Sequence, residues 1–320
     1  MSDSRRRAFS STYRGGIQPT PSPYYGDNHI YAEFDIQEGE ENTTMNIIGS
    51  RVSHITANNC TIYVDDVEIP FSKTYVFPTA GIHKVVYVFN TQMTSLWGML
   101  SGCNIKNVDC NDFDATALTT TANMCMSCSR LYSFYALSWE NSIGVDMSGM
   151  FGWTPFESIE IGTFSENGFK VTNLQNFASN SRNAELGRKK SIVDMSGCYG
   201  EVEKWDRCFR RQLGSSWMRY LDLGQIKLVG VKQEIFSWGE RESLEYFRVG
   251  GLYKADITEF NGYNLLDVYS IMSIIEALPK LTIDPLNGTE EYTLTLGSTM
   301  LAKLTDEQKS VATSKGWKLA

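Results

Sequence analysis

A short apolar pattern recurs along the middle of the chain. In each copy an apolar anchor is followed by apolar residues three and five positions later, and the anchors Ile105, Leu131 and Phe156 lie 26 and 25 residues apart. A period in this range is typical of solenoid proteins, because one unit buries its apolar side only against stacked neighbours. The copies are Ile105, Val108 and Cys110; Leu131, Phe134 and Ala136; Phe156, Ile159 and Ile161; Met218, Leu221 and Leu223; and Leu244, Phe247 and Val249, with Val193 and Met195 as a degenerate copy.

The residue between the two apolar positions of each copy points to the opposite face, because strand side chains alternate between faces. These outward positions and their outward neighbours are Tyr87, Asp109, Tyr135, Glu160, Asp194, Tyr220, Asp222, Tyr246 and Arg248. Aromatic rings beside carboxylates suit the recognition of a sugar or a protein. A polar outer face is also what a solvated strand shows without any ligand. We take the nine residues as the candidate ligand-binding set, with that plain alternative left open.

The chain before the repeats predicts a different architecture. Its strand-like segments, rich in β-branched and aromatic residues and separated by turn formers, are 29–36, 61–64 and 84–89. We expect a small antiparallel β domain at 29–80 that covers the exposed apolar end of a solenoid spanning 81–304. The last of the three segments is a candidate for the first solenoid strand, with Val86 and Val88 pointing inward.

Apolar residues at helical spacing predict short helices in the connectors between the solenoid strands. These stretches are 93–100, 147–151 and 202–209. A longer amphipathic stretch at 265–278 ends before Pro279, which cannot continue a helix. The pattern therefore predicts an α/β fold, an irregular solenoid of short parallel strands with helical connectors and a β cap.

The end of the chain carries a helix-start signal. Thr305 and Gln308 have the spacing of a capping box, in which each side chain bonds a backbone N–H at the first turn. Together with Gly316 as a left-handed C-cap, they predict a C-terminal capping helix at 305–320. Trp317 is the expected apolar plug, and residues 292–296 before the helix predict a final strand.

Residues 1–28 form a separate segment. Pro19, Pro21 and Pro23 exclude a helix there, because each lacks an N–H and restricts the residue before it. The segment is either a disordered tail or an anchoring arm that orders on a partner. Its candidate docking residues are Arg5, Arg6, Arg7, Tyr13, Arg14, Tyr24 and Tyr25.

Charge and composition narrow the classes of function. The net charge of −8 argues against a nucleic-acid binder, since phosphate contacts require a basic surface. The sequence has no apolar run long enough for a membrane span and no apolar h-region after its arginines, so we expect neither a span nor a Sec signal peptide. Seven cysteines, an odd number, fit a reduced compartment better than a disulfide framework.

Candidate chemical motifs are few. Cys103, Cys110, Cys125 and Cys128 could form a zinc site, but the places of Cys103, Cys110 and Cys128 in the repeat favour small core residues instead. The acidic stretch at 109–114 lacks the central glycine and distal glutamate of a calcium loop. No phosphate loop, nucleophile motif or spaced acid–base pair is visible, although distant carboxylates could still converge on folding. We therefore predict a non-enzymatic protein without catalytic residues, metal or cofactor.

Three phrases of the repeat and the end of the chain resemble the BspA-like leucine-rich-repeat family. They are Met99-Leu-Ser-Gly-Cys103-Asn-Ile105, Met126-Ser-Cys128-Ser-Arg-Leu131 and Asp146-Met-Ser-Gly-Met-Phe151, with residues 304–309 and 315–319 at the end. The resemblance covers roughly residues 80–320 and implies a leucine-rich-repeat solenoid with a binding or structural role. Similar chains occur as bacterial surface proteins and as virion or tail proteins of phages of gut bacteria.

Two functions follow as expectations. The first is a phage virion or tail component, assembled in the host cytoplasm, that docks on other virion proteins by its N-terminal arm and displays the solenoid as a binding surface. The alternative is a bacterial cell-surface adhesin that binds a host protein or glycan. In both we expect no nucleic-acid partner, and the chain is a candidate for homo-oligomerisation.

Overall fold

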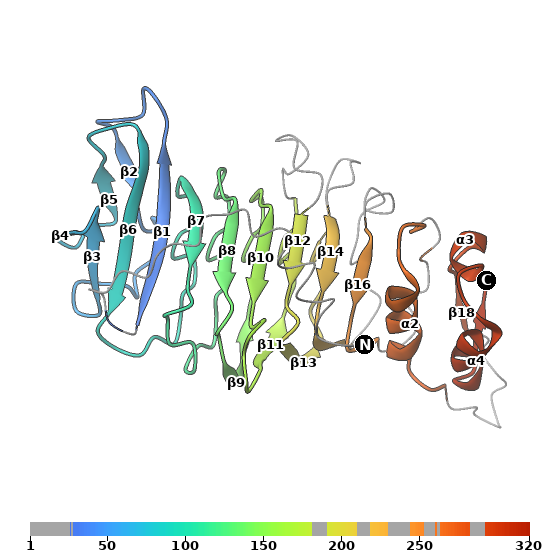
Figure 1. The fold of residues 1–320 in the computed structure, drawn as a ribbon. Coiled ribbons are helices and arrows are strands. Elements are labelled where there is room, and N and C mark those ends of the chain that lie inside the picture. The colour runs from blue at the N-terminus through green and yellow to red at the C-terminus, as the bar shows by residue number, and fades with distance from the viewer. Residues whose placement is uncertain are drawn as a thin grey trace.

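The computed structural model describes residue 26 and residues 28–180, 191–209, 218–229, 244–252, 260, 263–281 and 292–320. The fold is mixed α/β, with strands far outnumbering helices in these residues. The strands stand side by side in an elongated stack, with the antiparallel strands at one end and the helices at the other (Figure 1). One continuous cluster of buried apolar side chains runs through the stack, from Ile30 to Trp317.

The principal sheet has ten strands in the order β16-β14-β12-β10-β8-β7-β1-β6-β3-β4. Its parallel part comprises β7 (Ile105–Asp109), β8 (Ser133–Ala136), β10 (Ser158–Ile161), β12 (Ser191–Asp194), β14 (Met218–Asp222) and β16 (Tyr246–Arg248). The predicted inward residues Val108, Phe134, Ile159, Val193, Leu221 and Phe247 are register partners from strand to strand, and all are fully buried. The repeat in the sequence thus sets the alignment of the strands, because a slip by one residue would turn every apolar side chain to the outside.

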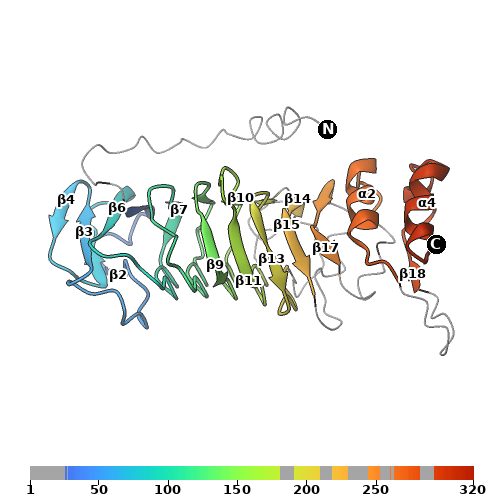
Figure 2. The ribbon, with the colours of Figure 1, turned by 90° about the horizontal axis from the view of Figure 1, so that it is seen from below.

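A second sheet of parallel strands lies along the other side of the stack (Figure 2). Its strands are β9 (Asn141–Asp146), β11 (Phe169–Asn173), β13 (Cys198–Val202), β15 (Gln225–Leu228) and β17 (Gly251–Leu252), in the order β17-β15-β13-β11-β9. Each follows one strand of the principal sheet in the chain. The aromatic residues Phe134, Trp139, Phe151, Phe169 and Phe177 pack against one another between the sheets.

The prediction of short helices in the three connectors is wrong. Residues 93–100, 147–151 and 202–209 contain hydrogen-bonded turns instead of helices. From Leu96 to Gly102, alternate N–H groups donate to carbonyls in the next repeat, such as Gly98 to Ala122. Of the intervening N–H groups, those of Met99 and Ser101 donate to the carbonyl three residues back, and that of Trp97 donates to the Ser95 hydroxyl. A row of tight turns therefore buries residues at the same i, i+3 and i+4 spacing as a helix, which is why the apolar pattern was misleading.

Residues with positive φ recur at equivalent places in these turns. Gly98, Asn123, Gly149, Asn176 and Arg207 have φ between 56° and 62°. A second series four residues later comprises Gly102, Ser127, Trp153 and Asn180. A left-handed residue interrupts the helical hydrogen-bond ladder, so the chain turns instead of coiling.

The antiparallel end of the principal sheet is larger than the predicted cap at 29–80. It comprises β1 (His29–Ile36), β3 (Cys60–Val64), β4 (Val67–Ile69) and β6 (Gly81–Phe89), beside a ribbon of β2 (Thr44–Asn46) and β5 (Thr74–Val76). β6 pairs antiparallel with both β1 and β3, so it is not the first parallel strand that 84–89 suggested. β1 also pairs antiparallel with β7, which joins the cap and the parallel strands in one sheet.

Helix α2 (Val268–Ala277) closes the opposite edge of the principal sheet. It lies within the helix predicted at 265–278, and Asp267 caps its first turn by accepting the N–H of Ser270. The hydroxyls of Ser270 and Ser273 accept the N–H groups of Phe247 and Val249, at 3.1 and 3.3 Å. The helix therefore satisfies edge donors of β16 that would otherwise be open to another strand.

The C-terminal elements partly match their prediction. Helix α4 (Asp306–Ser314) begins with the predicted capping box of Thr305 and Gln308, and Gly316 after it has φ of +89°. The predicted strand is β18 (Tyr292–Leu294), and the short helix α3 is Ser298–Leu301. Residues 317–319 form strand β19 instead of continuing the predicted helix, and Trp317 within it is buried.

The seven cysteines are free and buried. Cys103, Cys110 and Cys128 are each at most 1% exposed, in the core where the spacing placed them, and Cys125 is 0% exposed as well. Burial raises the pKa of Cys103 and Cys110 well above the usual range, so these thiols stay protonated. In the described residues no three His, Cys, Asp or Glu side chains cluster in a way that would hold a metal ion.

Candidate ligand-binding face

Six of the nine predicted outward residues form one row across the principal sheet. Asp109, Tyr135, Glu160, Asp194, Asp222 and Arg248 are successive register partners on β7, β8, β10, β12, β14 and β16. Tyr220 and Tyr246 are partners of each other two residues earlier on β14 and β16. We call these eight residues the outer row. The strand alternation that predicted a shared face for them is confirmed.

Tyr87 does not belong to the outer row. It lies on the antiparallel strand β6, where it is fully buried and its hydroxyl donates to the carbonyl of Ile47. The prediction failed because 84–89 was aligned with parallel strands that it does not join. The docking residues expected at 5–25 lie outside the described residues.

The outer row is more covered at its C-terminal end than the sequence indicated. Asp109, Tyr135, Glu160 and Tyr246 are partly exposed, whereas Asp194, Tyr220 and Arg248 are each 8% exposed and Asp222 is 0% exposed. Buried charges are stable only when they are paired and hydrogen-bonded. The C-terminal part of the row is therefore a bonded network as well as a surface.

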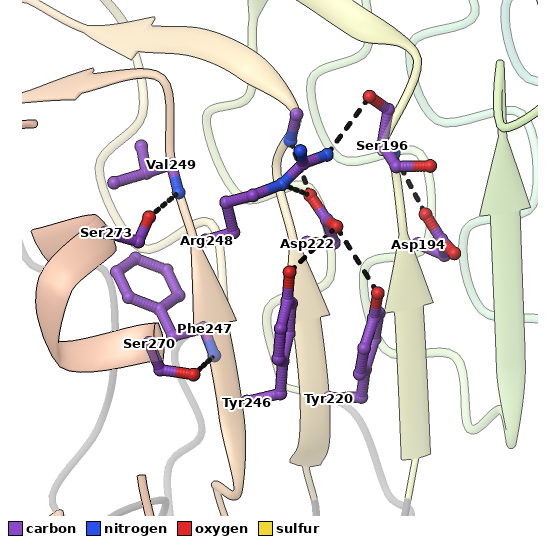
Figure 3. A network of polar contacts seen from close by, with 11 residues as sticks. Asp194, Ser196, Tyr220, Asp222, Tyr246, Phe247, Arg248, Val249, Ser270 and Ser273 are labelled. Carbon is purple, nitrogen blue, oxygen red and sulfur yellow. Dashed lines mark hydrogen bonds and ion pairs between the residues drawn. The ribbon is translucent and has the colours of Figure 1, made fainter. Parts of the chain in front are cut away.

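Asp222 is the centre of this network (Figure 3). Its Oδ1 accepts the Arg248 Nε–H at 2.6 Å and the Gly224 N–H at 2.8 Å, and its Oδ2 accepts the hydroxyls of Tyr220 at 3.3 Å and Tyr246 at 3.4 Å. Arg248 also donates from Nη2 to the carbonyl of Ser196 at 3.2 Å. Three neighbouring strands are tied together by one carboxylate and one guanidinium.

Asp194 stands next to this pair on β12. Its Oδ1 accepts the Ser196 N–H at 2.9 Å. Burial, followed by the charge of Asp222, raises the pKa of Asp194 to about 7. Near neutral pH the protonated and ionised forms of this carboxyl are therefore both populated.

Three tyrosine rings stack beside the network. Tyr220 and Tyr246 lie 4.4 Å apart between ring centroids at 7°, and Tyr246 and Tyr269 of helix α2 lie 5.9 Å apart at 17°. Burial, followed by the charge of Asp194, raises the pKa of Tyr220, so its hydroxyl remains a donor to Asp222. Tyr269 ends the stack and is 38% exposed. The sequence predicted two of these rings and missed the third, because α2 meets the sheet only in the folded chain.

A hollow of about 250 Å³ opens beside Arg248, between the last strands and helix α2. It is lined by Gly224, Gln225, Arg248, Val249, Gly250, Tyr269, Met272, Ser273, Glu276 and Ala277. Only Arg248 among them belongs to the outer row. No spacing in the sequence could have shown it, since the hollow depends on how the helix packs against the sheet edge.

The sequence also missed a group in the cap that looks like a nucleophile–base–acid set. His83 lies with Nδ1 2.7 Å from Asp65 Oδ2 and with Nε2 3.3 Å from the Thr79 hydroxyl. Nε2 is closer to the Thr79 carbonyl, at 2.8 Å, and a carbonyl only accepts. The Nε2 proton is then directed to that carbonyl, so His83 holds the turn together and does not activate the hydroxyl.

The helices in the described parts of the chain are too short or too polar to cross a membrane. Comparison of the whole chain with protein-family models, curated proteins and solved structures found no match.

Proposed function

We propose that the chain is a non-enzymatic recognition protein, a leucine-rich-repeat-like solenoid whose outer row binds a ligand on another surface. The observation that carries this proposal is the outer row itself. Six polar or aromatic side chains occupy one register position across six parallel strands, beside a stack of three tyrosines. The buried apolar repeat aligns these positions, and the aromatic and charged side chains that occupy them offer an extended ligand such as a glycan or peptide a continuous row of contacts.

Two further features support the solenoid. The positive-φ residues Gly98, Asn123, Gly149 and Asn176 lie 25, 26 and 27 residues apart, which matches the spacing of the strand anchors. The turns that contain them are bonded to the turns of the next repeat, as are the strands of both sheets. A solenoid needs such contacts on every side of each unit.

The carboxyl pair at the end of the outer row fits binding better than hydrolysis. Asp194 and Asp222 are neighbours, and the raised pKa of Asp194 resembles that of a general acid. A hydrolase also needs its second carboxylate to face the substrate or a water. Asp222 is 0% exposed and already accepts from four donors, so its role is to hold the strands and Arg248.

For the setting we propose a virion or tail component of a phage, with a bacterial surface adhesin as the alternative. The support is the resemblance of the repeat phrases and the cationic residues at 5–7 on a chain of net charge −8. In the virion setting the arm docks on other virion proteins and the stack projects outward. Capsid and tail genes beside its own gene would favour the first setting, and export or surface-protein genes the second. Particles that incorporate a chain lacking residues 1–25 at the full level would contradict docking by the arm.

Recognition by the outer row is tested with labelled protein on a panel of immobilised bacterial surface polysaccharides and surface proteins. We expect Tyr135→Ala and Tyr246→Ala to weaken binding, each by about 1–3 kcal/mol if the ring is a hot spot. Tyr63→Ala on β3 is the matched control, because it also removes a tyrosine ring but from the antiparallel end of the principal sheet, outside the outer row. Wild-type protein that binds nothing on the panel, or variants that all bind equally, would contradict the proposal.

A further inference from the structure

The hollow beside Arg248 has the mixed lining of a site for a small polar ligand. Its lining includes Gly224 and Gly250, in the connections that follow β14 and β16, and Tyr269, Ser273 and Glu276 of helix α2. At about 250 Å³ it is smaller than the ~300–1,000 Å³ of sites for drug-sized ligands. It has room for roughly eight waters at ~30 Å³ each, which suits a single ring with its substituents.

Both donors and acceptors face this space. Arg248 uses Nε for Asp222 and Nη2 for Ser196, and among the described residues no group accepts from its Nη1. The Ser273 hydroxyl accepts from Val249, which leaves its own proton to donate. Glu276 is exposed and supplies carboxylate oxygens. A ligand with several hydroxyl groups would satisfy all three side chains, because a hydroxyl both donates and accepts.

The charges disfavour an ion. Asp222 neutralises Arg248 at 2.6 Å, and Glu276 adds a negative charge to the lining, so a phosphate or carboxylate gains little here. A cation would meet the guanidinium of Arg248 in the same small space. A neutral ligand avoids both costs.

The exposed ring of Tyr269 narrows the ligand class further. Tyr246 stacks on the Tyr269 ring, and Tyr269, the last of the three stacked tyrosines, lines the hollow and remains 38% exposed. An exposed ring offers an apolar surface to the C–H face of a sugar, while the sugar hydroxyls point to polar groups around it. We propose that the hollow binds one neutral pyranose unit of a glycan, an inference that rests on the proposed recognition function and gives its ligand a chemical class.

The test uses the full chain and the methyl glycosides of glucose, galactose, mannose and N-acetylglucosamine, titrated by isothermal calorimetry or followed by saturation-transfer NMR. We expect at least one glycoside to bind the wild type. Tyr269→Ala and Glu276→Ala should each weaken that binding about tenfold, as the loss of a hot-spot contact does. Tyr63→Ala and Glu38→Ala, which remove a ring and a carboxylate far from the hollow, should leave it unchanged. Unchanged thermal unfolding would show that the variants fold, as expected for exposed positions.

Each outcome separates this inference from the proposed function. A glycoside that binds the wild type and both hollow variants equally overturns the hollow as its site. Failure of all four glycosides to bind, with binding to the surface panel retained, overturns the sugar assignment and leaves recognition by the outer row standing. Failure on both the glycosides and the panel overturns the two proposals together.

Discussion

Removing the Asp222 carboxylate should destabilise the fold more than any other single change in the outer row. Asp222 is 0% exposed, and Arg248 beside it has a side chain that is 9% exposed. In Asp222→Ala the guanidinium keeps its charge in a nearly dry place, and the Gly224 N–H and two tyrosine hydroxyls lose their acceptor. Breaking a buried ion pair on one side typically costs about 3–5 kcal/mol, which is a large part of the ~5–15 kcal/mol that holds a domain folded.

A double-mutant cycle shows whether the cost comes from the stranded charge. Arg248→Met removes the guanidinium and retains much of the side chain's length, so Asp222→Ala/Arg248→Met leaves no unpaired ion. We expect the double variant to be more stable than Asp222→Ala alone, with a coupling free energy of about 2 kcal/mol or more. Urea unfolding followed by far-UV circular dichroism and tyrosine fluorescence gives the four free energies of unfolding.

Two results would refute this reasoning. The first is a loss below about 1 kcal/mol in Asp222→Ala, the magnitude of an exposed pair. The second is additivity of the two single changes within about 0.5 kcal/mol, which would mean that the carboxylate and the guanidinium do not depend on each other.

Three other changes test separate parts of the structure. Between about pH 4 and 7 the folded chain keeps a proton on Asp194 that the unfolded chain has lost, so the contribution of Asp194 to stability falls as pH rises through that window. Asp194→Asn should remove this slope and be more stable than wild type at pH 8, by at most about 4 kcal/mol; equal unfolding midpoints of the two proteins across the window would contradict it. Gly149→Ala should lower the midpoint of thermal unfolding more than Gly102→Ala does. Both residues have positive φ, but only at Gly149 would a Cβ overlap the Asn123 side chain. Equal decreases in the midpoint would count against that contact. The seven buried thiols should react with a thiol reagent only after denaturation, and about one zinc per purified chain would show that the core assignment of the cysteines is wrong.

The strands could be predicted because their signal is local and repeated. Val108, Phe134 and Ile159 follow their anchors at a fixed distance, and each strand needs the same apolar face for the same core. The connectors could not be predicted by the same rule. Leu96, Met99 and Leu100 have helical spacing, but Gly98 between them adopts a left-handed conformation, and the N–H groups of Leu96 and Leu100 donate to carbonyls in the next repeat. Periodicity reports which side chains are buried, and it does not report where the backbone hydrogen bonds go.

In the candidate site, too, the sequence predicted which residues share a face but not how deeply they are buried. Strand alternation was sufficient to place Asp194, Asp222 and Arg248 on one face, because it depends only on position along a strand. Their degree of burial depends on contacts between strands and with α2, which single-sequence patterns do not contain. Tyr269 and Ser273 were missed for that reason, since they reach the sheet from a helix that looked like a plain amphipathic segment.

Helix α2 therefore connects the stability of the sheet edge with the proposed recognition site. Its serines satisfy the edge of β16, and this fixes the distance at which Tyr269 and Glu276 face Arg248. Asp222 fixes the guanidinium from the other side through its bond to Nε. If the hollow holds a sugar, the buried network is what positions its donors before the ligand arrives, and positioning groups in advance lowers the entropy that binding must overcome. The buried charges at this end of the outer row are then explained by the exposed groups that they hold in place.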